Sequence, residues 1–246
     1  GLNEEGAPRA SWARYIFGVC REMIKRGVDV KGFNTAFAGD VPLGAGMSSS
    51  AALESAYAYA INDLFGENKI DKFELAKVGQ ATEHNYIGVK CGIMDQFASV
   101  FGKEGSLMRL DCRSLEYQYF PFKPEGYRLV LVDSVVKHEL ASSAYNKRRQ
   151  SCENVVAAIA KKHEGVELLR DCTLEMLAEV KAEISEEDYM RAEYVIEEIQ
   201  RVLDVCDALT KGDYETVGQK MYETHYGMSK LYEVSCEELD FLNDVA

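Results

Sequence analysis

Hydrophobic residues recur at helical spacing near the start of the chain. Five of them share one face of a predicted helix: Trp12, Tyr15, Ile16, Val19 and Met23. Gly27 ends this pattern. Further on, a glycine-rich turn leads into a second helical stripe, which Gly66 closes. The spacing predicts a third helix over residues 72–86.

Several other segments alternate between apolar and polar residues, as strands do. The alternation predicts strands over residues 33–38, 106–111 and 117–120. A more continuous apolar run predicts a further strand over residues 128–133. Helices and strands together indicate an α+β architecture.

After about residue 138, glycine and proline almost vanish and helical periods dominate. Helices are predicted over 138–162, 174–180, 186–209 and 214–232. The third carries an apolar stripe that we interpret as the core of a helix bundle. Its members are Tyr189, Ala192, Val195, Ile196, Ile199, Val202, Leu203 and Cys206. The change of pattern suggests a domain boundary near residue 121.

Composition and charge restrict the classes of partner. The chain has 246 residues, 47% of them hydrophobic, which is typical of a globular protein. Its net charge of −13 argues against nucleic acid and anionic membranes as partners. No apolar run approaches the roughly 20 residues that span a bilayer. The 7 cysteines contain no C-x-x-C pair, so neither a disulfide framework nor a zinc site is indicated. We expect a soluble, cytoplasmic protein.

The segment VPLGAGMSSSAA has the features of an anion-binding site. Gly44 and Gly46 lack a β-carbon, so an oxygen-rich anion can approach the backbone N–H groups closely. Ser48, Ser49 and Ser50 then begin a helix, where N–H donors have no partner within the helix. One hydroxyl could also bind a Mg²⁺ ion that bridges phosphates. The alternative, from these residues alone, is an ordinary turn with a serine cap.

The spacing matches neither of two familiar phosphate loops, because a Walker loop ends in Gly-Lys-Ser/Thr and a Rossmann fingerprint has a third glycine. The run PLGAGMSSSAALE instead resembles the phosphate loop of the GHMP kinases. Within that superfamily, CGIMDQFASVFGKEGSLMRLDCRSLEY at residues 91–117 is similar to galactokinases. YNKRRQSCE at 145–153 and RAEYVIEEIQRV at 191–202 also resemble galactokinase segments.

This resemblance implies a two-domain α+β fold of the GHMP kinase type. Residues 1–120 would form part of an N-terminal domain like domain 2 of ribosomal protein S5, with the ATP phosphate loop and the catalytic aspartate. Residues 121–246 would form part of a helix-rich C-terminal domain.

Two motifs of galactokinases are absent from the sequence. The early one contains Pro-Gly-Arg and Gly-Glu-His-Thr-Asp-Tyr, and the late one contains Gly-Gly-Gly-Phe-Gly-Gly. The chain also lacks an initiator methionine, so we expect the fold to be incomplete at both ends. Because the early motif supplies an arginine close to the transferred phosphate, we expect no sugar phosphorylation by this chain alone.

The resemblance also assigns the nucleotide and metal sites. The phosphates of ATP would bind to seven residues, called the serine turn below: Gly44, Ala45, Gly46, Met47, Ser48, Ser49 and Ser50. Mg²⁺ would bind to Ser50 and Glu83, which supply a hydroxyl and a carboxylate as hard oxygen ligands. Trp12 matches an aromatic residue near the adenine. From the residues alone, Glu83 could instead be a solvated surface residue and Trp12 a core anchor.

Asp95 matches the catalytic aspartate of galactokinases. A carboxylate at this place would accept or orient the proton of a sugar hydroxyl. By resemblance, Gly92, Asp95 and Tyr145 border the sugar. Without the resemblance, Asp95 would be read as a cap or an ion-pair partner, and Tyr145 as a core residue with one polar end. The two arginines after Tyr145 are left out of the site, as partners for acids such as Glu153.

The implied function is transfer of the γ-phosphate of MgATP to the C1 hydroxyl of α-D-galactose, giving galactose 1-phosphate in the Leloir pathway. An N-acetylgalactosamine kinase on the same scaffold and a non-catalytic sensor of sugar and ATP are the alternatives. An acidic helical interaction module would leave the serine turn without a purpose. We expect a monomer that binds neither nucleic acid nor membrane.

Overall fold

The structure is a computed structural model that describes residues 6, 8–136 and 142–246. It consists of two compact units, Gly1–Tyr119 (unit 1) and Phe120–Ala246 (unit 2). No helix within the described ranges combines the length and the apolar composition that crossing a membrane requires.

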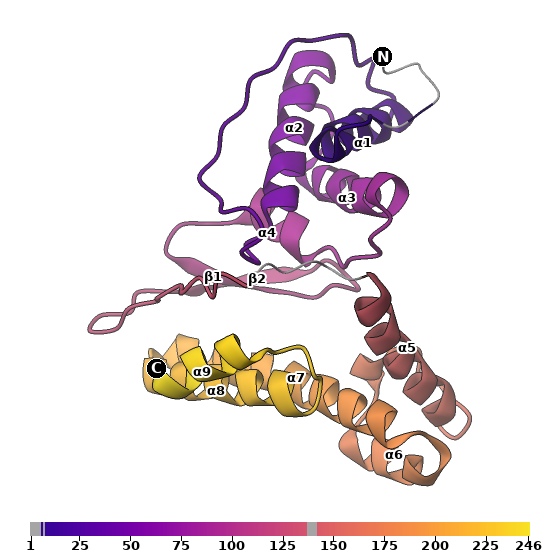
Figure 1. The fold of residues 1–246 in the computed structure, drawn as a ribbon, viewed down its shortest axis with the longest axis vertical. Coiled ribbons are helices and arrows are strands. Elements are labelled where there is room, and N and C mark those ends of the chain that lie inside the picture. Colours follow the sequence, from indigo (N-terminus) through magenta and orange to yellow (C-terminus); the bar gives the residue numbers. More distant parts are fainter. Residues whose placement is uncertain (1–5, 7, 137–141) are drawn as a thin grey trace. The chain divides into compact units, whose positions relative to one another are not determined.

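The described part of unit 1 contains four α-helices, labelled in Figure 1, and a short π-helix. They are α1 (Ser11–Lys25), α2 (Ser49–Phe65), α3 (Lys72–Thr82), η1 (Glu83–Ile87) and α4 (Met94–Phe101). The predicted helices near 12–23 and 72–86 are thereby confirmed, the second with a π-turn at its end. Helices α1, α2 and α3 pack on one another around buried Met23, Ile61 and Leu75. Burial of these apolar side chains is the main stabilising term of the unit.

A β-hairpin follows α4. Its strands are β1 (Ser106–Leu110) and β2 (Tyr117–Pro121), which pair in a two-stranded sheet and confirm the predicted strands at 106–111 and 117–120. Tyr117 of β2 packs on the rings of Phe97 and Phe101, with ring centroids 5.4 and 5.1 Å away. These aromatic contacts fix the position of α4 against the hairpin.

The strand predicted over 33–38 is wrong. The segment is extended but has no strand partner among the described residues, and a strand requires one. Its alternation has another cause, since Phe33 and Phe37 pack on Tyr57 of α2 and the Oγ1 atom of Thr35 lies 2.9 Å from the Tyr57 hydroxyl.

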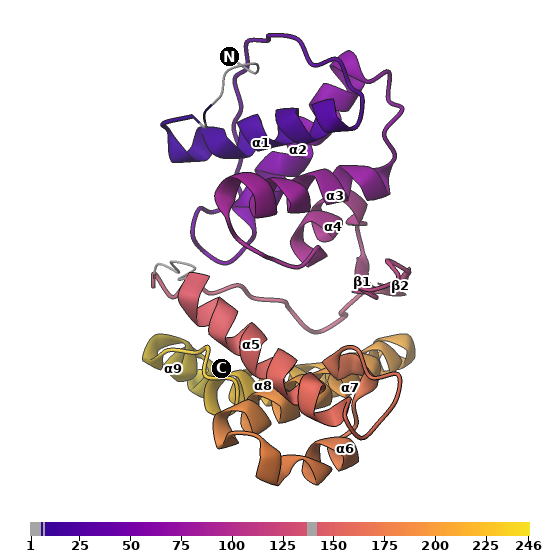
Figure 2. The ribbon, with the colours of Figure 1, turned by 90° about the vertical axis from the view of Figure 1, so that its right-hand side faces the viewer.

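Unit 2 is helical (Figure 2). Its α-helices are α5 (Ser142–Ile159), α6 (Leu174–Glu179), α7 (Glu186–Lys211), α8 (Tyr214–Lys230) and α9 (Glu237–Val245). Two short 3₁₀ turns, Leu169–Asp171 and Lys181–Glu183, flank α6. The four helices predicted after residue 138 are confirmed, although residues 138–141 lie outside the described residues. Helix α7 lies in the middle and contacts α5, α6 and α8.

The ends of α7 show why it forms where it does. The Ser185 hydroxyl accepts a hydrogen bond from the backbone N–H of Asp188 (3.1 Å), which caps the first turn. Gly212 then takes a left-handed conformation with φ of 70°, and its N–H bonds back to the carbonyl of Leu209. Glycine adopts this conformation with little strain, so the helix ends there.

Only part of the apolar stripe of α7 is buried. Its interpretation as the core of a helix bundle is wrong for the residues in the middle of the helix. Ala192 is buried and Ile196 packs against the same cluster, whereas Ile199, Val202 and Leu203 are 40–44% exposed. Helix α8 contacts α7 along this stretch through other residues, since Thr224 donates to Glu198 (2.8 Å) and Arg201 donates to Glu223 (3.2 Å).

The strand predicted over 128–133 is also wrong. Leu129, Val130, Leu131 and Val132 are 59–72% exposed and form no ladder within the described ranges. An apolar run predicts a strand only where another strand supplies the hydrogen bonds.

Periodicity does not predict α9. Polar contacts hold it to α8, because Asp240 accepts hydrogen bonds from Ser229 (2.9 Å) and Ser235 (2.7 Å) and lies 3.0 Å from Nε2 of His225. The Tyr226 hydroxyl of α8 also donates to Asp244 of α9 (2.9 Å).

Candidate active site

Three residues of the serine turn have left-handed backbone conformations. Gly44 and Gly46 have φ values of 73° and 72°, and a β-carbon at either would meet nothing within 4 Å. Ser48 has φ of 57°, in the left-handed region, where the backbone of any residue other than glycine is strained. The Ser48 side chain caps no N–H group of α2, which begins at Ser49. The first N–H donors of α2 are therefore left for a ligand.

Glu83 links the serine turn to α3. It begins the π-helix and is 7% exposed, so it is not the solvated surface residue that the sequence alone allowed. Burial raises the pKa of its carboxyl group, and the charge of Asp95 raises it further. A hydrogen bond from Ser50 and the nearby His84 act in the opposite direction. Ser50, Glu83 and Asp95, which the sequence predicted as site residues, thus interact within unit 1.

Asp95 stands in the first turn of α4 and is exposed. It forms no cap, because the residue in the N-cap position is Ile93, and no ion pair of Asp95 is found in the part of the chain that the structure describes. The neighbouring Gly92 faces open space, since a β-carbon there would contact no atom within 4 Å. A small polar molecule could therefore reach the carboxylate.

Two side chains missed by the sequence analysis hold the loop before α4. Nε2 of His84 lies 2.8 Å from the backbone carbonyl of Cys91, and the Gln80 side-chain amide donates to the same oxygen (3.3 Å). They fix the peptide next to Gly92 and so position the turn that carries Asp95. The sequence carries no signal for this role of His84, because its contact is with a backbone atom.

The Cys91 thiol is not a nucleophile. Burial raises its pKa to about 11, and the charges of Glu83, Glu54 and Asp95 act in the same direction. A thiol that keeps its proton at neutral pH is a poor nucleophile.

Trp12 is 55% exposed in the first turn of α1, and its ring centroid lies 5.8 Å from that of Phe37. The alternative of a core anchor is therefore wrong. An exposed indole with an aromatic neighbour offers a face on which a planar base could stack.

Tyr145 belongs to α5 of unit 2 and is 42% exposed, so it is not a core residue. The arginines that follow it have other partners. Arg149 donates to Glu153 (2.9 Å), and Nε of Arg148 donates to the carbonyl of Tyr232 (2.8 Å). Both arginines have structural contacts, in line with leaving them out of the site.

The residues expected to bind Mg²⁺ suit that ion. Ser50 and Glu83 supply two hard oxygen ligands from adjacent elements. Mg²⁺ commonly takes one or two protein carboxylates and completes its shell with water and phosphate oxygens. Within the described residues, no group of three or more His, Cys, Asp or Glu side chains could hold a metal ion. A bound phosphate would therefore be needed to complete this site.

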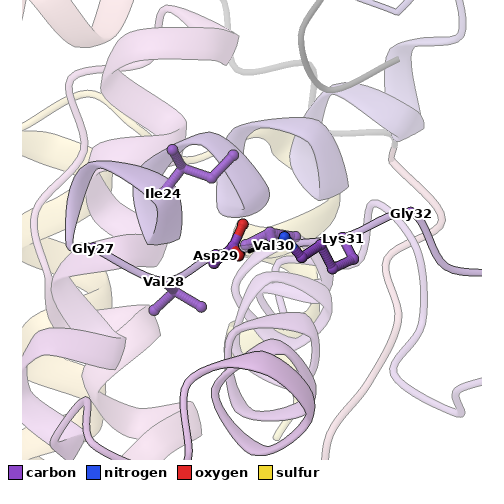
Figure 3. Close-up of a pocket in the computed structure, with 7 residues that line it drawn as sticks. All are labelled: Ile24, Gly27, Val28, Asp29, Val30, Lys31 and Gly32. Carbon is purple, nitrogen blue, oxygen red and sulfur yellow. Dashed lines mark hydrogen bonds and ion pairs between the residues drawn. The ribbon is translucent and has the colours of Figure 1, made fainter.

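Two surface hollows share no residue with the predicted site. One, of about 520 Å³, lies beside the end of α1, where Asp29 and Lys31 pair with each other (Figure 3). The other, of about 510 Å³, is in unit 2, where Arg201 and Lys220 are neutralised by acids such as Glu223.

Comparison with known proteins agrees with this geometry. The family described as GHMP kinases N terminal domain matches residues 14–103. The galactokinase of Thermotoga maritima is 47% identical over 233 residues, which are 95% of this chain and 64% of the relative. The galactokinase of Chloroflexus aggregans is 40% identical over 235 residues, which are 96% of this chain and 60% of that relative. This chain is related to the galactokinases of the GHMP kinase family.

Its fold is that of the same family. The crystal structure of Lactococcus lactis galactokinase complexed with galactose has a TM-score of 0.86 and 27% sequence identity, and the match covers 99% of this chain and 62% of that chain. The predicted GHMP kinase fold is thereby confirmed. The galactokinase-related chain spans 60–64% of the length of the two curated relatives named above.

Proposed function

We propose that this chain carries the phosphate-binding and proton-handling groups of a galactokinase, which transfers the γ-phosphate of ATP to the C1 hydroxyl of galactose. One observation supports this above the others. Glu83 interacts with both Ser50 of the serine turn and Asp95, so the group that would hold a phosphate and the group that would meet a sugar share one neighbour. The kinase relatives favour ATP as the phosphate donor.

In this proposal each residue has a distinct task. The N–H groups of the serine turn bind and orient the phosphates, because they are unpaired donors at the positive end of α2. Asp95 accepts or orients the proton of the C1 hydroxyl as that oxygen attacks phosphorus. Tyr145 and Gly92 border the sugar, and Trp12 stacks on the adenine. Ser50 and Glu83 would hold Mg²⁺, which neutralises charge that develops on the phosphates.

The galactose-complexed structure of the Lactococcus lactis enzyme favours galactose over N-acetylgalactosamine for a chain of this fold. The acetamido group would need additional room beside the sugar. We also propose a cytoplasmic location and a monomer, as the sequence suggested.

The decisive experiment uses a chimera in which this chain replaces the matching segment of Thermotoga maritima galactokinase. ADP formation is measured with galactose, with N-acetylgalactosamine and without sugar, in the chimera and in the 246-residue chain alone. We expect galactose-dependent ADP formation in the chimera and none in the chain. Asp95→Asn should lower kcat by about 10² to 10⁴ while ATP still binds, since general acid–base groups contribute that much.

Three results would contradict parts of this proposal. A chimera that binds ATP and galactose without turnover would favour the sensor. A higher kcat/KM for N-acetylgalactosamine would favour the other kinase. An unchanged kcat in Asp95→Asn would remove Asp95 from its role.

A further inference from the structure

A carboxyl group that the proposed reaction does not use lies inside unit 1, between α2 and α4. The side chain of Glu54, from α2, is fully buried. Its Oε2 atom accepts a hydrogen bond from Nε2 of Gln96 in α4 (3.2 Å). Its Oε1 atom is buried and has no hydrogen-bond partner in the structure.

Gln96 connects this carboxyl group to the candidate site. It follows Asp95 directly in the first turn of α4 and is 2% exposed. Its Oε1 atom is also buried without a partner. Because both residues belong to one helical turn, a displacement of the Gln96 side chain would shift the backbone that carries Asp95.

Helix α3 closes over the pair at Gly79. A β-carbon at Gly79 would lie 2.7 Å from Cγ of Gln96 and 3.1 Å from Oε2 of Glu54. Only a glycine lets α3 approach the pair without displacing one of them. Glu83 follows directly after the end of α3, while Ser50 lies in α2 and Asp95 in α4.

This arrangement of buried polar groups destabilises the core of unit 1. Two buried oxygens without partners cost about 1–3 kcal/mol each, whereas a pair of apolar side chains of similar volume would carry no such cost. Burial raises the pKa of Glu54 to about 9, the charge of Glu83 raises it as well, and the hydrogen bond from Gln96 lowers it. At neutral pH the group is therefore an uncharged acid, which adds no negative charge beside a phosphate site.

We propose that Glu54 is a positioning residue whose hydrogen bond to Gln96 fixes the separation between the serine turn and Asp95. The inference rests on the proposed function, because only phosphoryl transfer gives that separation a consequence. A misplacement of reacting groups by about 1 Å can cost about 100-fold in rate. The bond joins the two helices whose first turns carry the reacting partners.

The first test needs no turnover. In the ¹⁵N-labelled 246-residue chain, Glu54→Leu should shift the side-chain amide signals of Gln96 and the backbone amide signals of Asp95 and Ser50. Asp63→Leu, which removes an exposed carboxylate from the same helix, should leave all three in place. If Glu54→Leu leaves Gln96 and Asp95 unshifted, the inference is wrong.

The second test measures kinetics in the chimera. Glu54→Gln keeps an acceptor for Gln96 and should stay within about threefold of the unsubstituted kcat, whereas Glu54→Leu should lower kcat about 10- to 100-fold with little change in the KM for ATP. Gly79→Ala alters no polar group, yet it should lower kcat in the same way because it displaces Gln96.

The outcomes separate positioning from stability and from the proposed function. If activity falls only in proportion to the folded fraction, Glu54 is merely structural and the inference is overturned. If Glu54→Leu does not fold, Gly79→Ala decides, since alanine favours a helix by about 1 kcal/mol over glycine. An unsubstituted chimera without galactose-dependent turnover contradicts the proposed function, and the amide signals then decide whether Glu54 sets the position of Asp95.

Discussion

Ser50, in the first turn of α2, lowers the pKa of the carboxyl group of Glu83, at the start of the π-helix after α3, by hydrogen bonding to it. The bond joins two oxygen donors from distant parts of the sequence at the end of the serine turn. A π-turn is rare and is common at functional sites, where it redirects side chains. Here it brings Glu83 to the first turn of α2.

Ser50→Ala and Glu83→Gln should each weaken binding of Mg²⁺-nucleotide about tenfold, because each removes one hard ligand or a hydrogen bond to a charged group. Binding of the nucleotide in EDTA should change much less. Calorimetric titration of the two forms measures this difference, and Ser99→Ala on the exposed face of α4 is the matched control. An equal loss in EDTA would show that the pair binds phosphate and not the metal.

The contacts to the Cys91 carbonyl predict an effect on the sugar. His84→Ala should raise the KM for galactose of the chimera about 3- to 10-fold and leave that for ATP unchanged, since one net hydrogen bond contributes about 1 kcal/mol. Gln80→Ala should have a smaller effect, because its bond is longer (3.3 Å against 2.8 Å). Gln118→Ala, at an exposed position of β2, is the control. A change in the KM for ATP alone would contradict this role for His84.

The sequence predicts α1, α2, α3 and the serine turn, although not α4, because each depends on local signals, such as the spacing of Val19 and Met23 or the glycines at 44 and 46. It does not predict the contacts of Glu54 and His84, because they depend on where other helices lie. In the sequence, the buried Glu54 cannot be distinguished from an exposed glutamate on a helix. The partner of His84 is a backbone oxygen, which no side-chain pattern reveals. The strand predicted over 128–133 fails for a related reason, since an apolar run does not specify what covers it.

That apolar run predicts self-association of this chain when it is isolated, whereas the monomer is proposed for the galactokinase of which it carries a part. Val130 and Leu131 are 72% and 69% exposed, and unpaired apolar strand-like segments associate edge to edge. Val130→Lys should reduce the association measured by sedimentation velocity. Leu64→Lys, at a 65% exposed position on α2, should not. A chain that stays monomeric at all concentrations would contradict this prediction.

Trp12 offers a direct signal for the nucleotide, because the chain has 1 tryptophan. If adenine stacks on the exposed indole, ATP should quench its fluorescence, whereas tripolyphosphate should bind without quenching. Stacking of a base on an aromatic ring contributes about 1–3 kcal/mol, so Trp12→Ala should weaken ATP binding about tenfold or more and leave tripolyphosphate unaffected. Equal losses for both ligands would place the adenine elsewhere.

Glu54 predicts how stability depends on pH. Its ordinary pKa of 4.5 is raised to about 9 in the folded chain, first by burial. Between these values the folded state holds a proton that the unfolded state releases, so the free energy of unfolding falls as pH rises. The slope is about 1.4 kcal/mol per pH unit for one proton, or about 3 kcal/mol from pH 5.5 to pH 8 as an upper limit.

The side chain in Glu54→Gln cannot titrate, so the free energy of unfolding of this variant should not show this fall. It should therefore rise relative to that of the unsubstituted chain as the pH increases over the same range. Urea unfolding of both chains at several pH values measures the difference. If the two free energies of unfolding differ by the same amount at every pH, Glu54 is ionised in the folded chain and adds a negative charge near the candidate site.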